Sequence, residues 1–193
     1  MNQGVAITGM GIISAIGNTV EENYQSLINN KTGITSVDNI STIHKNEIKV
    51  GEIKKSNREF CEELGISEDN NFSRTAMLGV IAAKQAVSNA GIASINEYRT
   101  GLISATSVGG MDMTERYFYE YPEHEEYRKY IFSHNAGDIT HKIADSLGLN
   151  GMVTTISTAC SSAANSIMLG ARLIKSGKLD RVIPTRPGKV SPS

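Results

Sequence analysis

The sequence predicts an α/β fold in which helices cover a mainly parallel sheet. Short apolar segments rich in β-branched residues alternate with longer segments whose apolar residues recur three or four positions apart. The clearest pair is the run MVTTIS, residues 152–157, followed from Ser161 onward by helical spacing. Alternation of this kind is typical of layered folds with parallel strand pairing. The 193 residues are enough for one domain with a substantial core.

The first half of the chain contains two well-marked helices. One follows Glu21 and Glu22, whose charges suit a helix N-terminus, and the other carries a face of small and apolar residues and stops near Gly91. In order, we expect a strand at Gly4–Thr8, a helix at Val20–Asn30, a strand at Ile48–Ile53, a short helix at Arg58–Leu64 and a helix at Ser73–Asn89.

The second half repeats the alternation around an irregular insert. Residues 112–132 are aromatic and charged, with several glutamates close together, and no element is assigned to them. The expected elements are a buried strand at Gly101–Thr106, a helix at Ile139–Leu147 that Gly148 stops, the strand at 152–157, the helix from Ser161 and a strand beginning at Arg181–Ile183.

Composition excludes several classes of protein. Hydrophobic residues make up 39% and charged residues 20%, which is the globular range, and a net charge of -1 gives no basic field for nucleic acid. Apolar runs are too short to span a bilayer, and the N-terminus lacks the features of a signal peptide, so we expect no membrane association. Two cysteines cannot form a disulfide framework, which predicts a reducing, cytoplasmic location.

The C-terminal ten residues break the pattern. Three of the four prolines, Pro184, Pro187 and Pro192, lie there, and proline cannot donate to a strand ladder, so the strand at Arg181 cannot continue as a central one. We therefore divide the chain into a domain at 1–183 and an atypical proline-rich tail at 184–193. The tail is either a disordered terminus or the mark of a truncation or frameshift.

Cys160 lies between the predicted strand and helix. A cysteine among small residues is often only a buried core residue. At a helix N-terminus, however, unpaired N–H groups and the helix dipole stabilise a thiolate, and the small neighbours allow a substrate to approach. The Cys160 N–H would also be placed to stabilise an oxyanion. The pattern favours covalent acyl transfer through a thioester. Cys61, within a charged helix-like segment, is expected to be structural.

A dinucleotide-binding loop is a weaker interpretation of the N-terminus. The run GMGIIS, residues 9–14, follows an apolar strand-like segment, but Ser14 replaces the third glycine of the usual motif. The following acidic residues are too early (Glu21, Glu22) or too late (Asp38) to bind a ribose.

The residues around Cys160 resemble the active-site signature of the β-ketoacyl-acyl carrier protein synthases, condensing enzymes of the thiolase-like fold. The resemblance extends to the N-terminal VAITGMGIISAIGN, to residues 73–91 (with Met77 where glutamine is usual) and to the loop ATSVGGMD, and it covers residues 4–183. The signature matches at Gly151, Ile156, Ala159, Cys160, Ser161, Ser162, Ala163 and Ile167.

The resemblance implies the N-terminal half of the layered αβαβα fold and an acyltransferase. Cys160 would be the nucleophile that accepts an acyl group for decarboxylative condensation with malonyl-acyl carrier protein, in fatty acid or related polyene or polyketide synthesis. Val108 and Met111 match positions near the acyl pocket. The implied partners are an acyl carrier protein, acyl and malonyl thioesters and a second copy in a homodimer, with no metal or organic cofactor. Arg74 and Lys84 either receive the acidic carrier or form a solvated helix face.

The family's two decarboxylating histidines lie in a C-terminal half that has no counterpart in these 193 residues. None of the four histidines here stands in a matching motif: His44, His124, His134 and His141. We therefore expect the chain alone to lack condensation and to leave an apolar face of the helix after Cys160 uncovered. The alternative is a non-catalytic fragment or a dimerisation partner of a full-length synthase.

Overall fold

A three-stranded parallel sheet forms the centre of the fold. This computed structural model describes residues 4–40 and 42–188. The central strand β3 (Thr100–Ala105) pairs with β4 (Met152–Ile156), with Gly101 opposite Met152, and with β5 (Arg181–Thr185), with Thr100 opposite Arg181. Every residue of β3 is buried, as its apolar run predicts for a strand covered on both faces. The three expected strands in this half are confirmed within one or two residues.

β5 continues through Pro184 to Thr185. Proline is tolerated there because β5 is an edge strand of the described sheet, ordered β4–β3–β5. Arg181 donates its N–H to the Arg99 carbonyl on the β3 side. The N–H groups of successive strand residues point to opposite edges, so the nitrogen of Pro184 faces the outer edge, where no ladder bond is lost.

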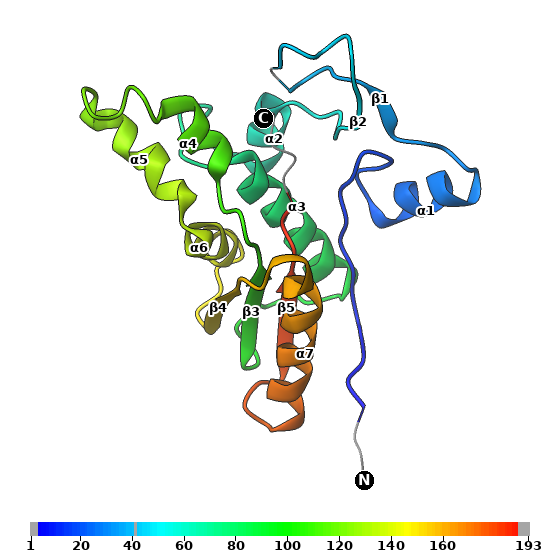
Figure 1. Cartoon of the computed structure of the whole chain (residues 1–193). Coiled ribbons are helices and arrows are strands. Elements are labelled where there is room, and N and C mark those ends of the chain that lie inside the picture. Colours follow the sequence, from blue (N-terminus) through cyan, green and yellow to red (C-terminus); the bar gives the residue numbers. More distant parts are fainter. Residues whose placement is uncertain (1–3, 41, 189–193) are drawn as a thin grey trace.

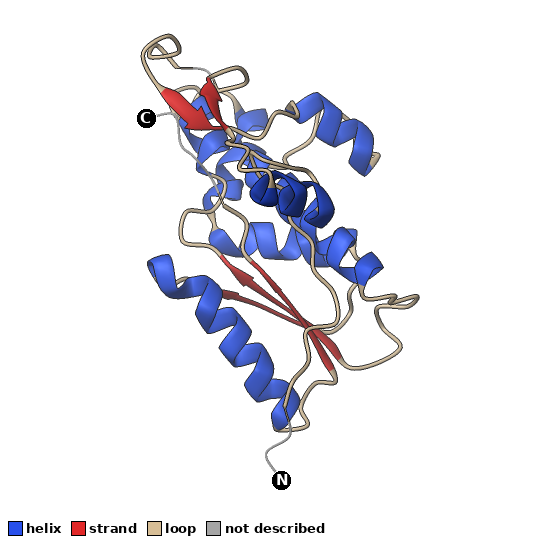
Figure 2. Ribbon diagram, turned by 90° about the vertical axis from the view of Figure 1, so that its right-hand side faces the viewer, coloured by secondary structure: helices blue, strands red, loops and turns tan. Residues whose placement is uncertain are grey.

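Helices cover the two faces of the sheet (Figure 2). α7 (Ser162–Lys175) packs against β3 and β5 on one face, so closely that a side chain at Gly170 would meet Val182. α3 (Arg74–Asn89) and α6 (Ala136–Ser146) lie on the other face, where Ile183 joins their core, consistent with the alternation of side chains along a strand. The helices predicted at these positions are confirmed.

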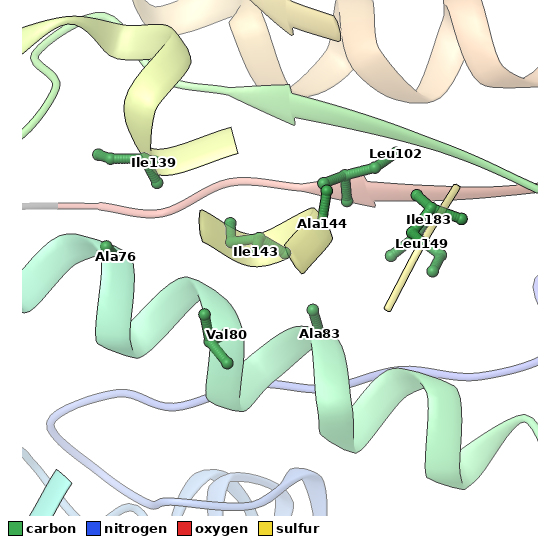
Figure 3. Close-up of a cluster of buried hydrophobic side chains, with 9 residues drawn as sticks. All are labelled: Ala76, Val80, Ala83, Leu102, Ile139, Ile143, Ala144, Leu149 and Ile183. Atoms are coloured by element: carbon green, nitrogen blue, oxygen red, sulfur yellow. The ribbon is translucent and has the colours of Figure 1, made fainter. Parts of the chain in front are cut away.

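The main core lies between α3, α6 and the sheet (Figure 3). α3 contributes small residues at helical spacing, which lets the helices approach closely, while β3 and α6 contribute larger side chains. The buried cluster comprises Ala76, Val80, Ala83, Leu102, Ile139, Ile143, Ala144, Leu149 and Ile183.

Smaller elements surround this unit (Figure 1). Ser56 and Glu59 form a reciprocal capping box at α2, which explains its start one residue earlier than predicted. The antiparallel pair β1–β2 is held by the Glu52 carboxylate, which accepts N–H bonds from residues 38–40. The bounds are α1 Val20–Ile28, β1 Ile34–Ser36, β2 Lys49–Gly51 and α2 Asn57–Leu64.

The segment without a predicted element is largely helical. Tyr117 and Tyr130 stack with ring centroids 4.2 Å apart, so the aromatic residues that obscure the periodicity join the two short helices. The elements are α4 (Met111–Tyr117), the 3₁₀ turns Glu125–Tyr127 and Phe132–His134, and α5 (Arg128–Ile131).

The strand expected at Gly4–Thr8 is wrong. Residues 4–13 are extended but carry no ladder, and side chains of α3 bind their amides: Asn89 accepts from Met10 at 3.0 Å and Gln85 from Ile12 at 3.1 Å. A strand requires a neighbouring backbone, and a groove of about 990 Å³ separates this segment from the edge of β5.

The N-terminal glycines pack against a helix. A Cβ at Gly9 would lie 2.4 Å from the Ala86 carbonyl oxygen, and one at Gly11 would lie 2.0 Å from that of Ala82. The segment can approach α3 this closely only because glycine has no Cβ. The next helix, α1, starts only at Val20, so the strand–turn–helix geometry of a dinucleotide-binding loop is not formed.

α7 leaves apolar side chains in solvent. Ile167 is 55% exposed and Met168 44%, and its buried residues are Ser162, Ser166 and Gly170. The predicted uncovered face of this helix is therefore confirmed for the described chain.

Candidate active site

Cys160 lies at the junction between β4 and α7, as the sequence predicts. β4 ends at Ile156, a single 3₁₀ turn spans Ala159–Ser161, and α7 begins at Ser162. The Cys160 thiol is free and its residue exposed. Because β3 and β4 are parallel, the loops that follow them meet at the same edge of the sheet, where ligand sites of α/β folds are common.

The backbone at the junction is strained. Ala159, directly before Cys160, has a φ of +51° and is one of two non-glycine residues with positive φ among those the structure describes. The left-handed conformation is unfavourable for alanine because its Cβ crowds the carbonyl oxygen. Strain of this kind concentrates at functional sites, since surrounding contacts must maintain it. The sharp turn presents Cys160 to solvent ahead of the helix.

Ser162 closes this turn with its side chain. It is 1% exposed, and its Oγ accepts from the Thr158 N–H at 2.8 Å and donates to the Ala159 carbonyl at 2.8 Å. Ser161 makes a separate bond to the Thr158 carbonyl at 2.7 Å. The sequence marks both serines as positions of the family signature and as small neighbours of Cys160, but it does not predict these hydrogen bonds.

The loop after β3 touches the same turn. Ser107 Oγ lies 3.4 Å from the Ala159 carbonyl oxygen and 3.4 Å from Ser162 Oγ. Val108 follows, 44% exposed, and Met111 is half-buried at the start of α4. Ser107 therefore connects this loop, which leads to both predicted acyl-pocket residues, to the turn at residues 158–162 (the cysteine turn). The sequence did not single out Ser107.

Cys61 is a core residue, as expected. It is 4% exposed, its Sγ lies 4.0 Å from Met77 Sδ, and Asn70 Nδ2 donates to it at 3.3 Å. Met77, which departs from the usual glutamine of the resembled family, is 2% exposed in the same cluster.

Arg74 is engaged within the chain. Its guanidinium donates to the carbonyls of Ile53 and Lys55 at 2.9 and 2.7 Å and to Asn57 Oδ1 at 2.7 Å. Burial lowers the pKa of this arginine. Its donors therefore fix residues 53–57 to α3, which leaves exposed Lys84 as the basic residue of that helix that faces solvent.

The four histidines lie in other local settings. His44 and His124 are paired with Glu47 and Glu126 on the surface, His134 contacts Thr114 Oγ1 at 3.3 Å, and His141 is exposed on α6.

Across 4–40 and 42–188, no cluster of three or more His, Cys, Asp or Glu side chains is arranged for a metal ion. None of the helices in those ranges has the length and apolar character of a membrane span.

Curated relatives match nearly the whole length of this chain. It is 28% identical over 195 residues to 3-oxoacyl-[acyl-carrier-protein] synthase 2 of Vibrio cholerae serotype O1, covering 97% of this chain and 46% of that enzyme. The protein of the same name from Staphylococcus aureus strain COL is 28% identical over 188 residues, covering 94% and 45%. The chain thus spans about half the length of the curated relatives it matches.

Solved structures give the same match. The ishigamide ketosynthase/chain length factor superposes with a TM-score of 0.76 at 25% identity, covering 92% of this chain and 45% of that one. The ketosynthase ApeO of Xenorhabdus doucetiae, solved in complex with its chain length factor ApeC, gives a TM-score of 0.70 at 24% identity and covers 91% and 44%. The fold is therefore the thiolase-like fold of ketosynthases. Residues 2–184 match the family described as beta-ketoacyl synthase, N-terminal domain, and the chain belongs to that family.

Proposed function

We propose that Cys160 is the acyl-accepting nucleophile of a β-ketoacyl-acyl carrier protein synthase. The observation that carries the proposal is an exposed thiol on a strained turn, directly after Ala159 with its φ of +51° and before the first turn of a 14-residue helix. The small residues on either side of Cys160 leave room for a thioester to approach its sulfur. The name of the relatives from Vibrio cholerae and Staphylococcus aureus, 3-oxoacyl-[acyl-carrier-protein] synthase 2, supports an acyl carrier protein as the donor.

Val108 and Met111 are proposed to contact the acyl chain. Their loop is tied to the cysteine turn by Ser107, and Val108 offers an exposed apolar side chain. A Met111→Ala variant is expected to alter the preferred acyl length, measured by competition between short and medium acyl thioesters. An unchanged preference would remove Met111 from the pocket.

We infer that these 193 residues accept an acyl group but do not complete a condensation. Decarboxylation of malonyl in the resembled family requires two histidines, and the histidines of this chain are engaged with Glu47, Glu126 and Thr114 or exposed on α6. In the whole reaction the acyl group on Cys160 would condense with malonyl-acyl carrier protein.

Mass spectrometry tests the proposal. The chain is incubated with hexanoyl-N-acetylcysteamine, digested and mapped. We expect one hexanoyl group on Cys160, none in a Cys160→Ser variant, and full labelling in the matched Cys61→Ser variant. Labelling of Cys61 alone, or none at all, would refute the assignment. Malonyl-dependent formation of a 3-oxoacyl product by the isolated chain would refute the inferred lack of condensation.

A second candidate function is assembly with a full-length synthase. The exposed Ile167 and Met168 on α7 favour it, because apolar residues on a helix that faces the solvent mark an unfilled interface. Light scattering after size exclusion would detect a mixed assembly with such a synthase. Replacing Met168 by glutamate should abolish that assembly while leaving acylation of Cys160 intact, and assembly that survives the change would exclude this face.

A further inference from the structure

The buried hydroxyl of Ser162 contacts the backbone on both sides of the strained residue. One oxygen accepts from the Thr158 N–H at 2.8 Å and donates to the Ala159 carbonyl at 2.8 Å, and its residue is 1% exposed. Ser107 Oγ lies 3.4 Å from the same Ala159 carbonyl, from a loop 52 positions away. The Ala159 carbonyl therefore faces the hydroxyl groups of Ser162, at the start of α7, and of Ser107, in the loop after β3, and it also accepts the Ser162 N–H that closes the 3₁₀ turn.

The orientation of the Ala159 carbonyl fixes the direction of the Cys160 N–H. The peptide bond between Ala159 and Cys160 is trans and planar, so its C=O and N–H point in opposite directions. With the carbonyl turned toward Ser162, the Cys160 N–H is turned away from it, on the side of the exposed residue. A positive φ at Ala159 is unfavourable by itself, so the Ser162 N–H alone has to hold this peptide once the two side-chain bonds of Ser162 are removed, and the peptide is then freer to relax.

We propose that Ser162 is a positioning residue that holds the Cys160 N–H as an oxyanion donor. The inference rests on the proposed acyl transfer to Cys160. In that step the Cys160 thiolate bonds to the thioester carbonyl carbon, and the carbonyl electron pair moves onto oxygen. The oxyanion then collapses and expels the donor thiolate, which takes up a proton equivalent to the one that the Cys160 thiol lost. A fixed N–H stabilises the transient oxyanion because it needs no reorganisation.

The test compares two reactions of the same sulfur. Acylation by hexanoyl-N-acetylcysteamine passes through an oxyanion, whereas alkylation by iodoacetamide does not. In Ser162→Ala we expect acylation to slow by about 10- to 100-fold. The upper figure approaches the loss of rate that follows complete removal of one oxyanion-hole donor. Alkylation should stay within about threefold of the parent chain, because the thiol itself is unchanged.

Ser166→Ala is the matched control. Ser166 lies one turn later on α7, is also 1% exposed, and donates to the carbonyl three residues earlier, Ala163, at 2.8 Å. It does not touch the cysteine turn, so both rates should match the parent. Equal acylation by Ser162→Ala and Ser166→Ala would overturn the proposal, and so would a parallel fall of acylation and alkylation in Ser162→Ala, which indicates general disruption of the turn.

A second measurement decides the proposal if the parent chain takes no acyl group. The ¹H–¹⁵N residual dipolar coupling of Cys160 reports the direction of its N–H without any reaction. We expect it to change or broaden in Ser162→Ala and to match the parent in Ser166→Ala. An unchanged coupling in Ser162→Ala overturns the positioning role, whereas a changed coupling in a chain that cannot be acylated supports it and refutes only the proposed function.

Discussion

Replacing Ala159 by glycine tests the strained turn before Cys160. Ala159 has a φ of +51° and is exposed, so the substitution removes strain without removing a buried contact. Relief of a left-handed alanine is worth about 1–2 kcal/mol. The greater freedom of glycine in the unfolded chain offsets about 0.4–1 kcal/mol of this. We therefore expect Ala159→Gly to raise the free energy of unfolding by about 1 kcal/mol.

The control is the same substitution within the following helix. Ala164 is also exposed but lies inside α7, where glycine costs about 1 kcal/mol. The two variants should therefore differ by about 2 kcal/mol, or about 4–8 °C in Tm for a chain of this size.

Thermal unfolding followed by circular dichroism, with urea unfolding as a check, measures both variants. If Ala159→Gly destabilises the chain as much as Ala164→Gly does, then Ala159 is not held in the left-handed region. The turn would then not be a source of strain, and the structural argument for a preorganised Cys160 would lose its main support.

Three further predictions concern stability. Leu102→Ala, at a side chain with no exposed surface in the central strand, should lower the free energy of unfolding by about 2–5 kcal/mol in urea titration; a loss below 1 kcal/mol would contradict the packed core. Glu52→Ala should leave the amides of residues 38–40 without an acceptor, so their hydrogen exchange should quicken selectively while that of β3 stays slow; unchanged exchange at those amides would contradict the contact. Hydrogen bonds from Arg99 lower the pKa of Asp180 below its ordinary 3.8 in the folded chain, so the unfolded chain binds the proton more readily. The Arg99–Asp180 pair therefore stabilises the fold above pH 3.8, and this stabilisation disappears as the pH falls through the folded pKa. Asp180→Asn should therefore lower stability at pH 7 and flatten its loss in acid, as measured by unfolding at pH 7 and pH 3, and an unaltered acid profile would count against the pair.

Local signals account for the elements that the sequence predicts well. Helical spacing and a serine cap place α3, and β-branched runs place β3 and β4, because these patterns act over a few residues of neighbouring chain. Cys160 is found at its junction for the same reason, since the change from strand to helical spacing occurs within about one turn.

The N-terminal segment shows where local signals fail. Val5 and Ile7 suggest a strand, but a strand exists only if another backbone lies beside it, and residues 4–13 instead meet α3 more than seventy positions away. The sequence likewise suggests that Arg74 is a free surface charge. In the folded chain its guanidinium donates to the carbonyls of Ile53 and Lys55, about twenty positions away.

The sequence by itself determined the family, the alternation of strands and helices, and the position of Cys160 between a strand and a helix, because the motifs behind each consist of residues close together in the chain. Only the tertiary structure decided that a second, distant loop contacts the turn before that cysteine. Ser107 and Ser162 are 55 positions apart, and they meet at the Ala159 carbonyl only because parallel strands bring the loops after β3 and β4 to one edge of the sheet.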